Sequence, residues 1–194
     1  MSTNLIDKVF ENHYARKLYH MFGGGLLVLG LVFLNTFWFI LLDSLYVLGF
    51  WIFGKRISFA AIGVMLLLIL SGSKPITLMA TLIWLVGDGL AGFIGAAYGT
   101  TKWPWHKQKS IQGSIAFLVG SFLMILLFLE MKSDLNPSIR TAFLFVPCLA
   151  ACIIETLPIS IIKDRKPDDN LIVILSTGVV LKILFVLFQV KDWF

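Results

Sequence analysis

Charged residues are scarce in this chain of 194 residues, and apolar residues dominate it. Asp, Glu, Lys and Arg together make up 14% of the sequence, whereas 58% of the residues are hydrophobic. The mean hydropathy is +0.90. One soluble core of this length cannot bury so much apolar surface. The composition therefore excludes an ordinary soluble domain and predicts an integral membrane protein with an all-α fold.

Cysteine is also rare, and a cleavable leader is not evident. Cys148 and Cys152 lie four residues apart in an apolar segment, where thiols are usually only packed, so we expect neither a disulfide nor a metal site there. The first apolar run starts only after Arg16 and Lys17 and lacks a small-residue cleavage site. Low-complexity segments and fixed-period repeats are absent from the sequence. We expect a single membrane domain over residues 1–194.

The long apolar runs predict about seven transmembrane helices, since a span needs about 20 mainly apolar residues. Six or eight spans remain open, because the third run is short and the junction near Asn35 is tight. With seven spans, eleven Lys and Arg residues fall on the side of the N-terminus and four on the other side, which predicts a cytoplasmic N-terminus. The same clustering at the ends of apolar runs explains the net charge of +5 without nucleic-acid binding. The predicted spans are 17–34, 36–53, 57–72, 75–98, 111–130, 139–162 and 171–190.

Asp88, in "WLVGDGLAGFIG", is the strongest single signal of function. A carboxylate inside a span costs about 2.5 to 3.5 kcal/mol on insertion scales, so such residues usually line a wet cavity and have a role. The simpler interpretation is an Asp that reaches water near the interface. Glycines at 87, 89, 92 and 95 surround it and would let another helix, or a phosphate chain, approach the backbone closely.

The next loop, "TTKWPWHKQKS", is basic and lies on the same predicted side of the membrane. Lys102, Lys107 and Lys109 offer point charges for a polyphosphate, and Ser110 is placed to cap the following helix, whose N-terminus also favours an anion. The alternative is a basic anchor with Trp103 and Trp105 as interfacial aromatic residues.

Carboxylates near the sixth and seventh spans complete an acidic set on this side. Glu155 lies inside a predicted span and is followed by Pro158, which can break the helix. Asp168 and Asp169 precede the last span. Hard oxygen ligands of this kind suit Mg²⁺ and its phosphates, although exposed acidic loop residues are as often only solvated. Asp43 is a further carboxylate in an apolar run, and no role can be assigned to it.

The segment "HYARKLYH" puts a basic stripe on one face of the first helix, at its predicted cytoplasmic end. Taken alone, Arg16, Lys17 and His20 would be basic residues that extend to the interface. The lysine loop and the acidic set on the same side favour a shared pocket for a metal-bound polyphosphate, with Arg16 and Lys17 holding the phosphates.

Five strings, "ARKLYH", "GDGLAGFIGAAYG", "KSIQGS", "ETLP" and "DDNL", resemble in that order the motifs of the polyprenol kinase family, which includes dolichol kinase, phytol kinase and CTP-dependent diacylglycerol kinase. The resemblance covers nearly the whole chain. It implies transfer of the γ-phosphoryl group of CTP, or of another nucleoside triphosphate, to the hydroxyl of a membrane lipid with Mg²⁺. The short chain favours a compact, phytol-kinase-like member that acts on an isoprenoid alcohol on the cytoplasmic face.

The resemblance assigns roles to residues by their motifs. The candidate catalytic residues are Asp88, Arg16, Lys17 and Glu155; the candidate nucleotide-binding residues are Gly87, Gly89, Gly92, Gly95, Lys102, Lys107, Lys109, Ser110 and His20; the candidate metal ligands are Asp88, Glu155, Asp168 and Asp169. The general base is either one of these carboxylates or His20.

Three other functions stay open at this point. A CTP-dependent diacylglycerol kinase would use the same motifs. A phosphatidate cytidylyltransferase would attack the α-phosphate instead, but its HGG-x-D-R-x-D string has no match here. A small ion-coupled transporter would use the intramembrane carboxylates to carry ions. The identity of the lipid alcohol, the preferred nucleotide and the oligomeric state cannot be read from the sequence.

Overall fold

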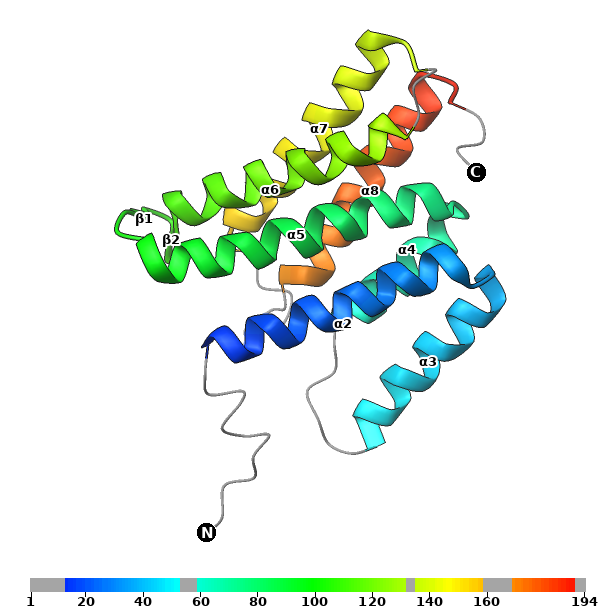
Figure 1. Ribbon diagram of the computed structural model, residues 1–194, viewed down its shortest axis with the longest axis horizontal. Coiled ribbons are helices and arrows are strands. Elements are labelled where there is room, and N and C mark those ends of the chain that lie inside the picture. Colours follow the sequence, from blue (N-terminus) through cyan, green and yellow to red (C-terminus); the bar gives the residue numbers. More distant parts are fainter. Residues whose placement is uncertain (1–12, 53–58, 132–134, 159–168, 191–194) are drawn as a thin grey trace.

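A computed structural model describes residues 13–52, 59–131, 135–158 and 169–190, and within these ranges the chain forms seven helices and one short hairpin (Figure 1). The all-α prediction is therefore confirmed. The hairpin lies between the fourth and fifth of these helices, where the sequence predicted only a loop. The elements are α2 (His13–Phe33), α3 (Thr36–Ile52), α4 (Phe59–Ser71), α5 (Lys74–Tyr98), β1 (Lys102–Trp103), β2 (His106–Ser110), α6 (Ile111–Glu130), α7 (Pro137–Thr156) and α8 (Asp169–Leu187).

Four helices, α5 to α8, are long and apolar enough to cross a membrane. The apolar parts of α2, α3 and α4 are shorter, and α4 has only 13 residues. At a rise of about 1.5 Å per residue, α4 is shorter than the hydrocarbon core of a bilayer, about 30 Å thick. Seven spans and a cytoplasmic N-terminus stay predictions.

Polar side chains cap the starts of several of the described helices. Asn35 accepts a hydrogen bond from the backbone of Trp38 at the start of α3. Ser73 and Ser110 accept in the same way from the third residue after them, at the starts of α5 and α6. Such side chains satisfy backbone N–H groups that have no partner inside the helix.

Helix α7 differs most from its predicted end. The predicted span 139–162 corresponds to α7, which ends at Thr156. The next residue, Leu157, is extended, with φ −76° and ψ 140°. Pro158 explains this end, because the ring of a proline disfavours helical backbone in the residue before it.

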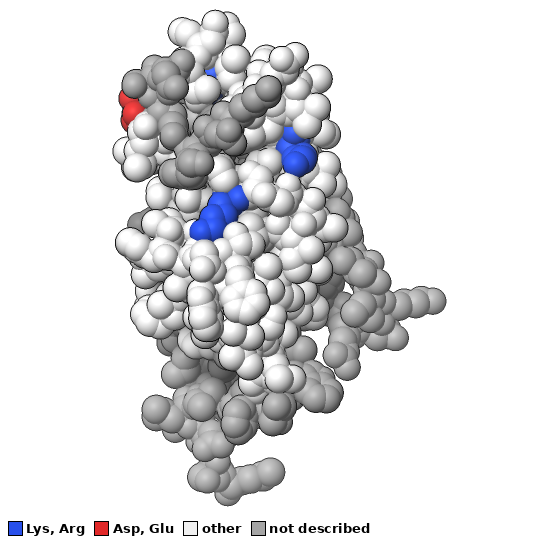
Figure 2. Space-filling model, turned by 90° about the vertical axis from the view of Figure 1, so that its right-hand side faces the viewer, with Lys and Arg blue, Asp and Glu red and all other residues white. Residues whose placement is uncertain are grey.

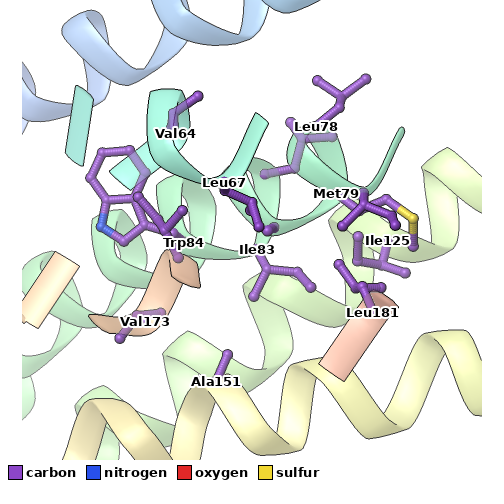
Figure 3. Close-up of a cluster of buried hydrophobic side chains, with 14 of the residues drawn as sticks. Val64, Leu67, Leu78, Met79, Ile83, Trp84, Ile125, Ala151, Val173 and Leu181 are labelled. Carbon is purple, nitrogen blue, oxygen red and sulfur yellow. The ribbon is translucent and has the colours of Figure 1, made fainter. Parts of the chain in front are cut away.

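The core lies around α5, whose buried face meets the other long helices (Figure 3). Met79 and Ile83 are fully buried there, and the cluster also contains Ile125 of α6 and Leu181 of α8. Large apolar side chains are also exposed on the outside of the bundle, on helices from α2 to α8. Because a soluble protein rarely exposes so much contiguous apolar surface, this exterior is typical of one that faces lipid.

The helix arrangement brings one set of helix ends together. Helices α2 and α6 begin, and α5 and α7 end, toward the left of Figure 1, where the hairpin also lies, and α8 begins nearer the middle, below α5. Asn170, at the start of α8, accepts a hydrogen bond from the indole of Trp84 in α5 at 2.8 Å, and both side chains are buried. This bond fixes the start of α8 against α5.

Candidate functional site

An ion pair between Lys17 and Asp88 joins α2 to α5. The ammonium nitrogen of Lys17 lies 2.8 Å and 2.7 Å from the two carboxylate oxygens of Asp88. It also donates to the backbone carbonyl of Asp88 at 3.4 Å. The two side chains are only 16% and 12% exposed. The carboxylate that stood out in an apolar stretch of the sequence therefore has a specific, largely buried cation as its partner.

The glycines around Asp88 allow this contact. A Cβ atom at position 92 would lie only 2.8 Å from Cδ of Lys17, so the lysine side chain crosses α5 directly over Gly92. A Cβ atom at position 89 would lie 3.1 Å from the sulfur of Met21, one turn further along α2. Glycine at these two positions lets α2 lie close to α5.

The other two predicted glycines face α6. A Cβ atom at position 87 would press against Phe117 and Ser121, and one at position 95 would lie 3.2 Å from Oγ of Ser110. In this structure the four glycines thus serve the close packing of helices. Their direct binding of a nucleotide stays a prediction.

A second ion pair joins the hairpin to α7. The ammonium group of Lys109, in β2, donates to Oε1 of Glu155 in the last turn of α7. The Glu155 side chain is only 4% exposed. The adjacent Ser110 caps α6 as predicted, because its Oγ accepts a hydrogen bond from the backbone of Gly113 at 3.1 Å. The strand and the capped helix start hold Lys109 in place.

The two ion pairs are neighbours. Lys109 and His20 also lie near enough to Asp88 to interact with its carboxylate through their charges. Residues from α2, α5, the hairpin and α7, distant in the sequence, therefore form one charged cluster at one end of the bundle. We refer to Lys17, His20, Asp88, Lys109 and Glu155 as the charged cluster.

The remaining predicted site residues lie around this cluster or outside the described residues. Lys102 and Lys107 are exposed on the hairpin. Arg16 belongs to α2 and Asp169 begins α8, but the described part of the structure does not include their side chains, and Asp168 lies outside it entirely. Among the described residues no three His, Cys, Asp or Glu side chains come together as a metal site. Asp88 and Glu155 are the two predicted metal ligands whose side chains are described.

Sequence reasoning missed how the hairpin tryptophans are bonded. The indole of Trp103 donates to Oγ of Ser114 at 2.9 Å, and that of Trp105 donates to the backbone carbonyl of Thr156 at 3.1 Å. The two strands pair antiparallel on either side of the turn that contains Pro104. The proline between the two tryptophans was the one local signal for a turn here, because "HKQKS" is polar throughout and shows no strand alternation.

The other end of the bundle uses its charges differently. The ammonium group of Lys74 donates to the carbonyl of Leu34 at the end of α2. That of Lys182 donates to the carbonyl of Ser71 at the end of α4, at 2.8 Å. These lysines satisfy carbonyls at helix ends. Figure 2 views the molecule from this side and shows a mostly uncharged surface with a few separate basic groups and an acidic group.

Comparison with known proteins finds kinases. The chain is 31% identical over 117 residues to probable phytol kinase 2, chloroplastic, of Glycine max, an alignment that covers 58% of this chain and 39% of the relative. It is 30% identical over 118 residues to farnesol kinase, chloroplastic, of Arabidopsis thaliana, covering 58% and 37%. It is 32% identical over 109 residues to phytol kinase 1, chloroplastic, of the same plant, covering 54% and 34%.

These relatives confirm the resemblance to the polyprenol kinase family that the motifs indicated. The matched region spans less than two fifths of the length of each of these relatives. No family model and no solved structure matches the chain.

Proposed function

We propose that this protein is a membrane-bound kinase that transfers the γ-phosphoryl group of a nucleoside triphosphate, CTP in particular, to the hydroxyl of an isoprenoid alcohol. The observation that carries the proposal is the charged cluster, in which two lysines and two carboxylates from four elements lie together at one end of an apolar bundle. Similarity to kinases of phytol and farnesol supports the reaction and the class of acceptor. The basic residues that gather at this end support a site on the cytoplasmic face.

The two ion pairs suit a site that receives a triphosphate. Without a nucleotide, each ammonium group is balanced by one carboxylate, so the buried cluster contains no isolated charge. A triphosphate brings several negative charges and is a better partner for the lysines than a single carboxylate. In our mechanism Lys17 and Lys109 turn to the phosphate oxygens and neutralise the charge that develops on the transferred group. Arg16 is a third candidate cation.

When the lysines turn to the phosphates, the carboxylates that they leave become available for a metal. Mg²⁺ in kinases is usually held by one or two carboxylates together with the phosphates of the substrate, so Asp88 and Glu155 fit this need without an all-protein cage. Asp168 and Asp169 are further candidate ligands. A bound Mg²⁺ would supply charge neutralisation between the phosphates.

The acceptor reaches the cluster from the lipid phase. The exposed apolar faces of the surrounding helices leave the isoprenoid chain in a hydrophobic environment while its hydroxyl meets the charged residues. A carboxylate of the cluster or His20 takes the proton of this hydroxyl as it attacks the γ-phosphorus. The oxygen then forms the new bond to phosphorus, and the nucleoside diphosphate leaves.

The test is a transfer assay with labelled nucleotides. Membranes containing the protein are incubated with Mg²⁺, with CTP or ATP labelled in the γ-phosphate, and with phytol, farnesol, geranylgeraniol or diacylglycerol in turn. We expect labelled lipid from an isoprenoid alcohol and none from the Asp88→Asn variant. Preferential labelling of diacylglycerol would move the assignment to a diacylglycerol kinase.

Two results would overturn the proposal. Transfer of label from the α-phosphate of CTP would indicate a cytidylyltransferase. Absence of labelled lipid with every donor and acceptor, from protein that is folded and inserted, would exclude the kinase.

A further inference from the structure

The hairpin carries two stacked tryptophans that are both fixed to the bundle. The ring centroids of Trp103 and Trp105 lie 4.8 Å apart with an interplanar angle of 25°. Their indole N–H groups donate to Ser114 in α6 and to Thr156 in α7. Two helices therefore determine the position of this pair.

This arrangement differs from that of an ordinary membrane anchor. A tryptophan at the membrane interface usually keeps its ring in the apolar layer and directs its N–H toward water or lipid headgroups. Here both N–H groups are bonded inside the protein, and Trp105 is still 50% exposed. Trp103 covers one face of the Trp105 ring, so a ligand that stacks on Trp105 would use the opposite face.

The exposed ring lies next to the charged cluster. Trp105 bonds to the carbonyl of Thr156, and the neighbouring residue Glu155 pairs with Lys109 of the same hairpin. Lys109 in turn interacts with the carboxylate of Asp88. The aromatic face and the groups assigned to the phosphates thus belong to one structural unit.

We propose that the exposed face of Trp105, backed by Trp103, binds the nucleobase of the phosphoryl donor by stacking. This inference rests on the proposed function, since it names the base-binding part of the same site. Aromatic side chains bind bases in this way in many proteins, and every base has a π-face. Stacking on Trp105 therefore supplies affinity for a nucleotide without selecting one base.

Charge favours a nucleotide over a lipid chain as the occupant. Residues 101–110 contain three lysines and no acidic residue. Lys102 and Lys107 are exposed on the hairpin. Ammonium groups around an aromatic face disfavour an isoprenoid chain and attract a polyanion that carries a flat ring.

The experiment separates the base from the phosphates. Purified protein in detergent is titrated with CTP, with ATP and with inorganic tripolyphosphate, each with Mg²⁺, by isothermal calorimetry. The variants are Trp105→Leu, Trp105→Phe, which keeps an aromatic ring, and Trp38→Leu. Trp38 is a matched control because it is a tryptophan of similar exposure, 52%, that lies at the start of α3 beside Asn35 and not on the hairpin.

We expect Trp105→Leu to weaken the binding of CTP and ATP by between about 5-fold and about 150-fold, the range of one lost base-stacking interaction. Tripolyphosphate should bind this variant as it binds the unchanged protein, which also shows that the variant is folded. Trp105→Phe should recover most of the affinity, and Trp38→Leu should change nothing.

Two results would overturn the stacking proposal while leaving the kinase intact. One is unchanged nucleotide affinity in Trp105→Leu. The other is an equal loss of tripolyphosphate and nucleotide binding, which would mean that the hairpin is only a structural support. Failure of the kinase itself would be seen separately, in the transfer assay with the unchanged protein.

Discussion

Lys17 reaches Asp88 by passing directly over Gly92, so the ion pair depends on a residue that carries no charge. The lysine nitrogen lies within 2.8 Å of both carboxylate oxygens. Gly92 is one helical turn beyond Asp88 on α5. Any side chain at position 92 would occupy the space of the lysine methylenes. The glycine-rich string thus helps to position the charged cluster.

The first prediction concerns Gly92→Ala. The added methyl group pushes Lys17 away from Asp88, and misplacement of a phosphate-binding group by about 1 Å can cost about a hundredfold in rate. We expect phosphoryl transfer to fall by between about tenfold and about a hundredfold. Gly25→Ala is the control, because a Cβ atom at position 25 meets no neighbour within 4 Å. Equal activity of the two variants would contradict the role given to Gly92.

A second prediction separates stability from activity at the Lys17–Asp88 pair. Lys17→Met leaves the Asp88 carboxylate buried without its cation, which we expect to destabilise the protein by about 3–5 kcal/mol. The double variant Lys17→Met with Asp88→Asn removes the isolated charge and should recover much of that loss. Both variants should lack kinase activity.

Stability is measured here by heating detergent-solubilised protein and following the monodisperse peak in size-exclusion chromatography. A double variant as unstable as Lys17→Met would show that the isolated Asp88 charge is not what destabilises Lys17→Met; with the Asp88→Asn single variant the same data give the coupling energy of the pair.

The helices were predictable because long apolar runs end at recognisable signals. Each predicted span corresponds to one described helix, and Ser110 caps α6 as predicted; the caps at Asn35 and Ser73 were not predicted. Two residues of the charged cluster could also be identified from the sequence. A charge inside an apolar run is costly, so Asp88 and Glu155 stood out from the sequence alone.

The pairing of these residues could not be predicted. Lys17 and Asp88 are 71 residues apart and Lys109 and Glu155 are 46 apart, so only the packing of whole helices determines which charges meet. Asn170 illustrates the same limit. In the sequence it accompanies the acidic residues before the last span, whereas in the structure its side chain bonds to Trp84. Its partner is a residue that no local pattern connects to it.

A third prediction compares two carboxylates that both form ion pairs, at opposite ends of the bundle. Glu155 pairs with Lys109, and Glu130 pairs with Arg140. Glu155→Gln should lower phosphoryl transfer by about a hundredfold or more, because the site loses the charged partner that holds Lys109 and a candidate ligand for Mg²⁺. Glu130→Gln should leave transfer unchanged, since this side chain is 63% exposed and such pairs contribute about 0–1 kcal/mol.

The comparison needs only the lipid transfer assay at saturating nucleotide and a check that both proteins elute as folded species. A similar loss in both variants would mean that the assay reports general damage to the bundle.

The fourth prediction concerns Asp43, a buried carboxylate of α3 that is not one of the charged-cluster residues. Its side chain is 4% exposed, and within the described residues neither carboxylate oxygen has a hydrogen-bond partner. Burial of a polar group without a partner costs about 1–3 kcal/mol, so Asp43→Leu should stabilise the protein by about that amount. Ser44→Leu tests the general effect of a leucine on α3, because Ser44 is exposed, and it should change stability little.

The activity of Asp43→Leu decides what the buried carboxylate is for. Retained phosphoryl transfer together with a higher unfolding temperature would mean that Asp43 destabilises the fold and has no role in the reaction. Loss of transfer from a protein that is more stable would mean that the unsatisfied carboxyl group is maintained for function, because proteins keep destabilising polar groups in apolar helices where activity requires them. The acceptor hydroxyl would then be the first group to examine as the partner of Asp43. The measurement is KM for the isoprenoid alcohol in Asp43→Asn, because this variant keeps the shape of the side chain and removes its charge.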